Sequence, residues 1–393
     1  MRTDRFCGLM EEAHVDVALI THMVDLYYFT GTIQPGFLVL SPGREPLLLV
    51  RKAYQRAEEE VAAGIRLAPI RSPKDLPGIL EAEGFPSPRR LGLELDVLPY
   101  LQAARTAALF PEADFVDVGA MERRLRAVKD EEELSRIRLA GEVWAVAMET
   151  VRTGFMPRMD EYDLALLVET KARRAGHQGL VRTRQMDFEI FIGHLLSGPH
   201  GAVPSRFDGP TGGPGSHPAI GQGAGHRTIL PGEPVLADYA SARDGYVYDG
   251  TRTFVEGTLT PDLTRAYEVA EEILRRFSAE AKPGQVIGEV VAHAFDAARR
   301  AGLEDHFMGW GPDRVRFLGH GVGLELDELP ILLERNGELF EENMVVAVEP
   351  KFVFPGVGAV GLENTYRVTE RGAEPLLLYE EGVIPLSPQV LAL

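Results

Sequence analysis

The sequence predicts an α+β fold with two domains, a larger C-terminal domain made of a duplicated α+β unit and a smaller α/β domain before it. Three observations predict this architecture. Short apolar runs alternate with helical segments in the N-terminal third, an internal repeat runs through the remainder, and two β-hairpins in that remainder each carry a pair of acidic residues. We therefore expect domains at residues 1–127 and 128–393.

The first domain alternates expected strands with expected helices. Apolar runs predict strands at 17–20, 37–40, 46–50, 90–94 and 115–118. Segments rich in helix formers predict helices at 2–13, 53–63 and 101–109. A short helix at 25–31 is expected only from the family resemblance described below. Such alternation is typical of an α/β domain. We found no chemistry-bearing motif in it and expect it to serve as scaffold or dimer contact.

The domain boundary is expected between Arg126 and Asp130. Asp130 precedes Glu131-Glu132-Glu133-Leu134. An aspartate is a favoured N-cap, and acidic residues in the first turn interact well with the helix dipole. A helix is therefore predicted to begin after Asp130.

The second domain contains an internal repeat. Residues 172–176, A-R-R-A-G, recur at 298–302, an offset of 126. At the same offset F-I-G-H ending at His194 recurs as F-L-G-H ending at His320. A duplicated unit would bring two hairpins together about a pseudo-twofold axis. His194 thus corresponds to His320, although we interpret His194 as a structural residue at a strand end.

A long segment at 197–228 is rich in glycine and proline. Loops of this length are usually functional lids or disordered. It carries His200, His217 and His226, which we expect to be exposed to solvent rather than catalytic.

Residues 234–254 predict the first hairpin. Apolar and aromatic residues flank an Asp-Gly pair at 244–245, a preferred two-residue turn. That turn gives a register that pairs Asp238 with Thr251 and Asp249 with Ala240. Both aspartates then lie on one face, because side chains alternate along a strand. A four-residue turn over 242–245 would set them directly opposite each other, still on that face.

Residues 345–368 predict a second hairpin around Pro355-Gly356. Glu349 and Glu363 are equidistant from Gly356 and so share a face. Proline follows Glu349 and removes a ladder donor, as expected of a strand end that opens onto a site. Between the hairpins, G-H-G-V-G places His320 among small residues that allow close backbone approach.

Together these residues indicate a metal site. Four ionised carboxylates on apolar strands carry charge that two divalent cations would neutralise, and oxygen ligands with one imidazole suit Mn, Fe, Co or Zn. The alternative for the first hairpin alone is an exposed turn with solvated acids. An isolated histidine is likewise more often structural than functional.

The same motifs carry a family resemblance. Asp238 is followed eleven positions later by Asp249 and G-T-R-T; then come G-H-G-V-G-L around His320, V-E-P at Glu349 and L-E-N-T at Glu363. This order resembles the aminopeptidase P, prolidase and creatinase family, which has the pita-bread fold. The resemblance covers the whole chain, including a smaller creatinase-type N-terminal domain, and implies that these five residues bind metal.

The resemblance also implies a mechanism. A hydroxide bridging two divalent ions would attack a carbonyl that one ion polarises. Asp249 and Glu363 would bridge the ions, Asp238 would bind one, and His320 and Glu349 the other. Glu349 would also take the proton of the attacking water. We expect two divalent ions, with manganese first and cobalt, iron or zinc as alternatives.

Three positions depart from the family pattern. Ser205 and Asp327 stand where the family has histidines, and Gly361 stands where it has an arginine. We keep Ser205 and Asp327 as candidate catalytic residues beside Glu349, with Asp327 or a loop histidine as the acid toward the leaving amine. Without the usual proton-handling groups, proline-directed peptidase activity is expected to be weak.

Three functions remain open. The first is a hydrolase similar to Xaa-Pro aminopeptidase or prolidase, which cleaves a peptide or amide bond. The second is a creatinase-like hydrolase or a lyase that acts on a small polar substrate. The third, a non-catalytic pita-bread module that binds protein, ranks last because all five ligand positions are filled.

Composition limits partners and location. The chain has 393 residues, 45% of them hydrophobic and 25% charged, as in ordinary globular proteins. A net charge of −18 argues against nucleic acid or an anionic membrane as partner. With the single Cys7, no membrane-length apolar run and a charged start, a cytoplasmic protein is expected. The resemblance implies a homodimer in which one N-terminal domain borders the partner's cleft.

Overall fold

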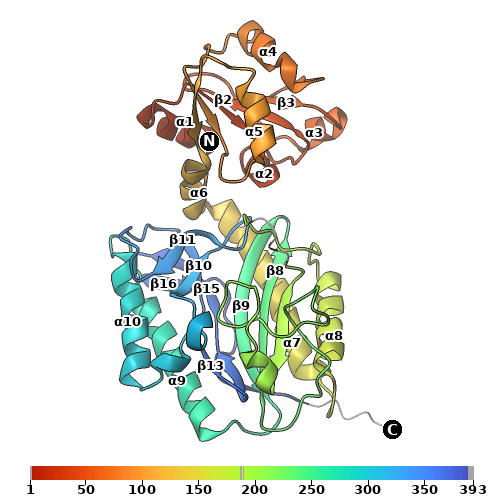
Figure 1. Cartoon of the computed structure of the whole chain (residues 1–393), viewed down its shortest axis with the longest axis vertical. Coiled ribbons are helices and arrows are strands. Elements are labelled where there is room, and N and C mark those ends of the chain that lie inside the picture. Colours follow the sequence, from red (N-terminus) through yellow and green to blue (C-terminus); the bar gives the residue numbers. More distant parts are fainter. Residues whose placement is uncertain (1, 186–187, 189, 388–393) are drawn as a thin grey trace. The chain divides into compact units, whose positions relative to one another are not determined.

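The computed structural model describes residues 2–185, 188 and 190–387. Figure 1 shows the course of the chain, which divides into two compact units between Arg126 and Ala127. Each unit has its own apolar core.

The N-terminal unit is built on a mixed six-stranded sheet with the order β4-β3-β2-β1-β5-β6. Its strands are β1 (Val17–Ile20), β2 (Gly36–Leu40), β3 (Leu47–Val50), β4 (Arg66–Pro69), β5 (Arg90–Leu93) and β6 (Asp114–Asp117). Its helices are α1 (Arg2–Glu12), α2 (Met23–Thr30), α3 (Tyr54–Glu60), α4 (Leu76–Ala82), α5 (Tyr100–Ala107) and α6 (Gly119–Ala127). The β1–β2 and β2–β3 pairs are antiparallel, and the other three pairs are parallel.

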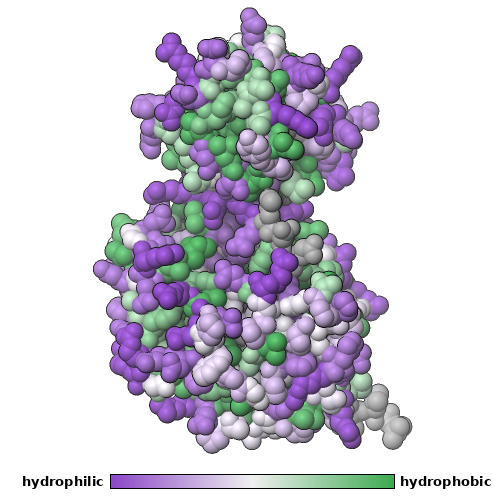
Figure 2. All heavy atoms as spheres, in the orientation of Figure 1, coloured by the Kyte–Doolittle hydropathy of each residue, from purple (hydrophilic) through white to green (hydrophobic). Residues whose placement is uncertain are grey.

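Five of these strands and α1, α2, α3 and α5 occur where the sequence predicted them. β4 was missed because Arg66-Leu-Ala-Pro69 is partly exposed and has no apolar run. α4 was missed because it contains a proline and a glycine, which weaken a helical pattern. On α5, Tyr100 and Leu101 are 83% and 65% exposed. Figure 2 shows hydrophobic residues gathered on one face of the N-terminal unit.

The C-terminal unit contains sheets of five, four and two strands. Its helices are α7 (Glu131–Gly154), α8 (Glu161–Arg174), α9 (Pro261–Glu280) and α10 (Ile287–Arg300). The four-stranded sheet has the order β17-β9-β8-β7, with β7 (Gly193–Ser197), β8 (Pro234–Arg243), β9 (Tyr246–Val255) and β17 (Ile384–Pro385).

The five-stranded sheet has the order β11-β10-β12-β15-β16. Its members are β10 (Phe317–Gly321), β11 (Glu328–Leu333), β12 (Val345–Val348), β15 (Asn364–Thr369) and β16 (Gly372–Pro375). The two-stranded sheet joins β13 (Lys351–Phe354) and β14 (Gly358–Gly361). In Figure 1, α9 and α10 lie on one side of these strands and α7 and α8 on the other.

The internal repeat is visible in the helices. α8 and α10 begin and end exactly one repeat apart, at Glu161–Arg174 and Ile287–Arg300, and α7 and α9 end one repeat apart at Gly154 and Glu280. The helix pair α7–α8 packs beside β7, β8 and β9, while α9 packs against β13, β14 and β16 and α10 against β10 and β11. The duplicated α+β unit expected from the sequence is therefore present.

Helix α7 starts as predicted. The Asp130 side chain accepts a hydrogen bond from the Glu133 N–H at 2.9 Å, and the Glu133 carboxylate accepts one from the Asp130 N–H at 2.9 Å. This reciprocal capping satisfies two backbone donors at the helix start. Among the described residues, no helix combines the length and apolarity needed to cross a membrane.

Candidate metal centre

The first hairpin has the register that a two-residue turn requires. Asp244 and Gly245 both have positive φ, 52° and 89°, as the favoured hairpin turn demands. Asp238 pairs with Thr251 and Asp249 with Ala240, which rules out the four-residue turn. Both aspartates line the same hollow of the C-terminal unit.

The second hairpin is one ladder that breaks at the acidic residues. Val348 pairs with Asn364 on one side of the break and Lys351 with Gly361 on the other, in the same register. Glu349 and Glu363 lie at the break, and Pro350 follows Glu349 as expected of a strand end. The hairpin thus divides into β12–β15 and β13–β14 at the site, which agrees with the strand end predicted at Glu349.

His320 lies on β10, which pairs with β12. Its Nδ1 lies 3.1 Å from the Gly321 carbonyl oxygen and can only donate to it, so the lone pair of Nε2 is free to face Asp249 at 3.7 Å. The close approach of the strands depends on Gly319, where a Cβ atom would lie 1.9 Å from the Ala347 carbonyl oxygen. Glycine is thus required beside the histidine.

Asp249, His320 and Glu363 form the first group that could hold an ion, with one ligand atom of each lying within 4.8 Å of the others. All three side chains are buried. Glu363 Oε1 is buried without a hydrogen-bond partner among the described residues, so one strong acceptor lacks a counterpart. Burial, with Glu363 and Asp238 nearby, raises the pKa of Asp249 well above its ordinary value. This group has the donor chemistry and the unneutralised charge that suit one divalent ion.

Lys351 occupies the other half of the cluster. Its Nζ lies 2.7 Å from Asp238 Oδ2, 2.7 Å from Glu349 Oε2 and 3.3 Å from Glu363 Oε2, and its side chain is 1% exposed. Burial opposes its charge, but the three carboxylates outweigh burial and raise the pKa of Lys351 well above its usual value. Sequence reasoning missed this residue, although its position two after Glu349 on one strand already placed it on the same face.

The carboxylates respond differently to this lysine. Burial alone would raise the pKa of Asp238, yet Lys351 and His194 together lower it. Glu349 is dominated by burial, which raises its pKa to about 7 despite Lys351. His320 would lose basicity through burial, but Asp327 and Glu349 raise its pKa.

Arg252 joins the two hairpins beneath the site. Its guanidinium donates to the Glu363 carbonyl at 2.7 Å and to Asn364 Oδ1 at 2.8 Å, and its side chain is fully buried. The Thr251 hydroxyl donates to Glu363 Oε2 at 2.7 Å. These bonds fix the carboxylate of Glu363 relative to the strand that carries Asp249.

His194 lies at the start of β7, as predicted, and its side chain also contacts the predicted ligand Asp238. It pairs with Asp238 across β7 and β8, and its Nε2 lies 3.3 Å from Asp238 Oδ2 and 3.0 Å from Thr211 Oγ1. It also lines the hollow. The repeat that matched it with His320 was the feature that could have identified it.

The two other predicted catalytic residues, Asp327 and Ser205, line different cavities. Asp327 lines the hollow, with Oδ1 at 3.8 Å from His320 Nδ1. Ser205 does not: it lines a neighbouring, more open cavity, and its hydroxyl accepts a hydrogen bond from the Phe207 N–H at 3.0 Å. The structure therefore does not bring Ser205 to the carboxylates, and the catalytic role predicted for it gains no support.

The glycine- and proline-rich loop forms part of the wall of the hollow through Phe207, Asp208, Pro210, Thr211 and Gln222. Its three histidines do not line that hollow. His200 was expected to be exposed but is partly buried. Its Nδ1 lies 2.8 Å from Oε2 of Glu161, the first residue of α8, and this contact helps to hold the loop to that helix. His226 is 65% exposed and His217 is exposed, as expected.

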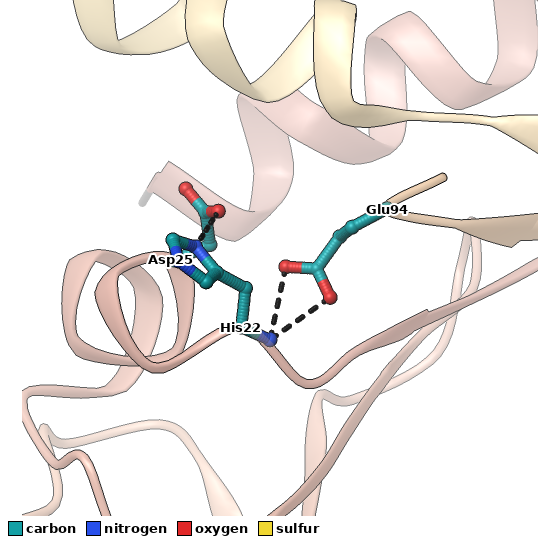
Figure 3. A group of neighbouring side chains, drawn as sticks. All are labelled: His22, Asp25 and Glu94. Carbon is teal, nitrogen blue, oxygen red and sulfur yellow. Dashed lines mark hydrogen bonds and ion pairs between the residues drawn. The ribbon is translucent and has the colours of Figure 1, made fainter. Parts of the chain in front are cut away.

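A second acidic group with a histidine lies in the N-terminal unit (Figure 3). Glu94 accepts hydrogen bonds from the Thr21 and His22 N–H groups at the start of α2, and Asp25 pairs with His22 Nδ1 at 2.8 Å and Arg126 Nη1 at 2.7 Å. These carboxylates already have protein partners that a metal would have to displace. We interpret this group as structural.

The donor set of the main cluster fits one divalent ion and does not fit a second without displacing the lysine. Asp249, His320 and the unpaired oxygen of Glu363 offer ligand atoms for one ion. Asp238, Glu349 and the other oxygen of Glu363 are already hydrogen-bonded to Lys351.

Comparison with known proteins identifies this arrangement. Residues 135–370 match the family described as Metallopeptidase family M24. The chain belongs to metallopeptidase family M24. Residues 2–128 match the Creatinase/Prolidase N-terminal domain. The family resemblance inferred from the ligand motifs is confirmed, and membership of this family implies divalent metal ions.

Similar proteins cover the M24 chain almost completely. It is 26% identical to the Xaa-Pro dipeptidase of Pyrococcus furiosus, over 98% of this chain and 99% of that one, and 25% identical to the Xaa-Pro dipeptidase of Lactobacillus delbrueckii, over 95% and 96%. The solved Xaa-Pro dipeptidase from Bacillus anthracis superposes with a TM-score of 0.81 at 23% identity, covering 98% of this chain and 99% of that one.

The prolidase from Pyrococcus furiosus superposes with a TM-score of 0.76 at 26% identity, covering 95% of this chain and 99% of that one. These likenesses confirm the predicted fold, a creatinase-type domain followed by a pita-bread domain. The M24 chain is therefore a pita-bread metallopeptidase by family and fold.

Proposed function

We propose that this M24 protein hydrolyses the peptide bond of short peptides, with Xaa-Pro dipeptides as the first substrates to test. The convergence of Asp249, His320 and the unpaired oxygen of Glu363 in one buried hollow carries the proposal. A divalent ion bound there would polarise a carbonyl and lower the pKa of water. The names of its relatives supply the substrate class.

The residues around that group divide into proposed roles. Glu349 is the proposed base for the attacking water, as the resemblance implied. Asp327 lies on the wall of the same hollow and in its protonated form is the proposed acid toward the leaving amine, whereas its ionised form could not donate. His194 holds Asp238 in place and faces the hollow. The remaining predicted catalytic residue, Ser205, lines a different cavity, so we propose no step for it.

A second candidate function is hydrolysis or elimination on a small polar substrate, as in creatinase. The observation that favours it is the fixed ammonium of Lys351 among the carboxylates, together with an anion at Asp327 where a neutral donor would serve peptide cleavage better. A neighbouring cation makes a carboxylate a poorer donor, because it favours the ionised form.

A substrate panel separates these candidates. The protein is stripped with a chelator, reloaded separately with Mn, Co, Fe or Zn, and offered Xaa-Pro dipeptides, other dipeptides, small amidines and sulfonium compounds. Asp249→Asn serves as the site variant, and Asp262→Asn, at an exposed position on α9, is the matched control. Metal-dependent Xaa-Pro cleavage that survives Asp262→Asn but not Asp249→Asn supports the proposal. Turnover restricted to the amidines or sulfonium compounds would replace it with the second candidate.

Four further expectations remain proposals. We propose manganese as the native metal, a domain division between residues 127 and 128, a homodimer and a cytoplasmic location. The exposed apolar residues Tyr100 and Leu101 on α5 support a protein contact in the N-terminal domain. Light scattering at micromolar concentration tests the dimer, and a monomer alone would contradict it.

A further inference from the structure

Lys351 comes from the strand that also carries a predicted ligand. It begins β13 two residues after Glu349, so both side chains point to the same face of the hairpin. Its ammonium has three N–H donors, and three carboxylate oxygens lie within hydrogen-bond distance, one each from Asp238, Glu349 and Glu363. The donor capacity of the lysine is thus fully used by residues that were expected to bind metal.

The backbone opposite makes room for this side chain. Gly361 pairs with Lys351 across β13 and β14. A Cβ atom at position 361 would lie 2.8 Å from Lys351 Cα and 2.9 Å from Lys351 Cγ, both closer than real Cβ atoms come to other carbon atoms. The stem of the lysine therefore runs over a glycine, and a larger residue at 361 would push it out of the cluster. Its position is built into the hairpin.

We propose that the ammonium of Lys351 permanently occupies one of the two cation positions of the carboxylate cluster, so that the site binds a single divalent ion. That ion would be held by Asp249, His320 and Glu363. The inference rests on the proposed metal-dependent function, and it differs from the expectation of a two-ion centre.

The division of the Glu363 carboxylate supports this arrangement. Oε2 accepts from Lys351 at 3.3 Å and from the Thr251 hydroxyl at 2.7 Å, while Oε1 has no hydrogen-bond partner among the described residues. One carboxylate thus faces an ammonium with one oxygen and offers the other to an ion. A second divalent ion bound by Asp238 and Glu349 would lie beside the ammonium, which already contacts one oxygen of each carboxylate at 2.7 Å, and two cations so close together repel each other.

Counting bound ions tests the proposal without reference to catalysis. The purified full-length protein is stripped of metal and equilibrated with Mn(II). Its ion content is then measured by dialysis and elemental analysis, and its electron paramagnetic resonance spectrum shows whether the ions are isolated or magnetically coupled. The test variant is Lys351→Met, which keeps an unbranched side chain of similar length but removes the charge. The control is Lys171→Met, at an exposed lysine on α8.

We expect about one isolated ion per chain in the wild type and in Lys171→Met, and about two coupled ions in Lys351→Met, the arrangement typical of two-metal sites. Should Lys351→Met fail to fold, Lys351→Gln removes the same charge. Two coupled ions in the wild type, no bound ion, or a variant that still takes only one ion would each overturn the proposal. One bound ion without any hydrolysis would instead count against the proposed function and leave this inference standing.

Discussion

Replacing Arg252 by methionine is expected both to destabilise the C-terminal unit and to weaken ion binding at its metal site. The buried guanidinium donates four hydrogen bonds: to the Thr251 carbonyl at 2.8 Å, the Glu363 carbonyl at 2.7 Å, Asn364 Oδ1 at 2.8 Å and the Glu380 carbonyl at 2.6 Å. Methionine fills much of the same space but donates nothing. The variant therefore removes the bonds while largely preserving the packing.

The magnitude follows from what each acceptor retains. The carbonyls of Thr251 and Glu363 also accept from each other's N–H, at 3.1 and 3.4 Å, so they lose less. Asn364 Oδ1 loses the donor that Arg252 supplied in the interior. Removing one partner of a buried polar network usually costs several kcal/mol, and we expect a loss of about 3–5 kcal/mol in the free energy of unfolding.

Urea unfolding followed by tryptophan emission measures this loss. Both tryptophans, Trp144 and Trp310, lie in the C-terminal unit. The Arg252 guanidinium carbon lies 5.0 Å from the centre of the Trp144 ring. Arg174→Met, an exposed position on α8, is the matched control and should change the free energy of unfolding by less than about 0.5 kcal/mol.

The same variant should bind Mn(II) about 10–100-fold more weakly, because Arg252 holds the backbone of Glu363 against the strand that carries Asp249. A free energy of unfolding within about 1 kcal/mol of the wild type would refute the network argument. Unchanged ion affinity in a destabilised variant would show that Arg252 supports the fold alone.

Three further outcomes are expected. Asp249→Asn should lower ion affinity by at least about 100-fold. The metal-free variant should melt no lower than the wild type, because burial and the carboxylates of Glu363 and Asp238 disfavour a charge on Asp249. A lower melting temperature of the variant would contradict this. Burial and a neighbouring aspartate raise the pKa of Glu94 to about 7, so its contribution to stability is complete below about pH 4.5 and is lost by about pH 7. Wild type should accordingly lose about 3 kcal/mol relative to Glu94→Gln across that window, and parallel pH profiles of unfolding would argue against it. Asp327→His places a hydrogen-bond donor on the wall of the hollow and should raise Xaa-Pro turnover by about tenfold or more, measured as kcat with unchanged ion content; equal or lower turnover would show that no such donor is missing.

Local sequence determined the elements and the register of the site. The Asp-Gly turn at 244–245 fixed which residues face each other, because its backbone matches the twist of a two-residue hairpin. Equal spacing about Gly356 likewise placed Glu349 and Glu363 at one level of the second hairpin. Asp130 marked the start of α7 through a capping interaction that involves only four consecutive residues.

Partners of the predicted ligands were within reach of the same rules but were not recognised. Lys351 follows Glu349 by two positions, and the alternation of side chains places it on the ligand face. His194 was matched to His320 by the repeat and lies opposite Asp238. Both were missed because a sequence does not show whether a lysine or a histidine at a strand end turns toward the carboxylates or toward solvent.

Only the tertiary structure decided which groups meet across sheets. Asp249 belongs to the four-stranded sheet and His320 to the five-stranded one, and nothing in either strand specifies the distance between them. Packing alone sets Ser205 apart in a second cavity, since the path of a long loop rich in glycine and proline has no periodicity to predict it. Placement of the lysine likewise depended on the space over Gly361, a property of two paired backbones rather than of either residue. The sequence therefore indicated candidate ligands, while the tertiary fold determined how close they lie to one another and to Lys351, because those distances join strands that are far apart in the chain.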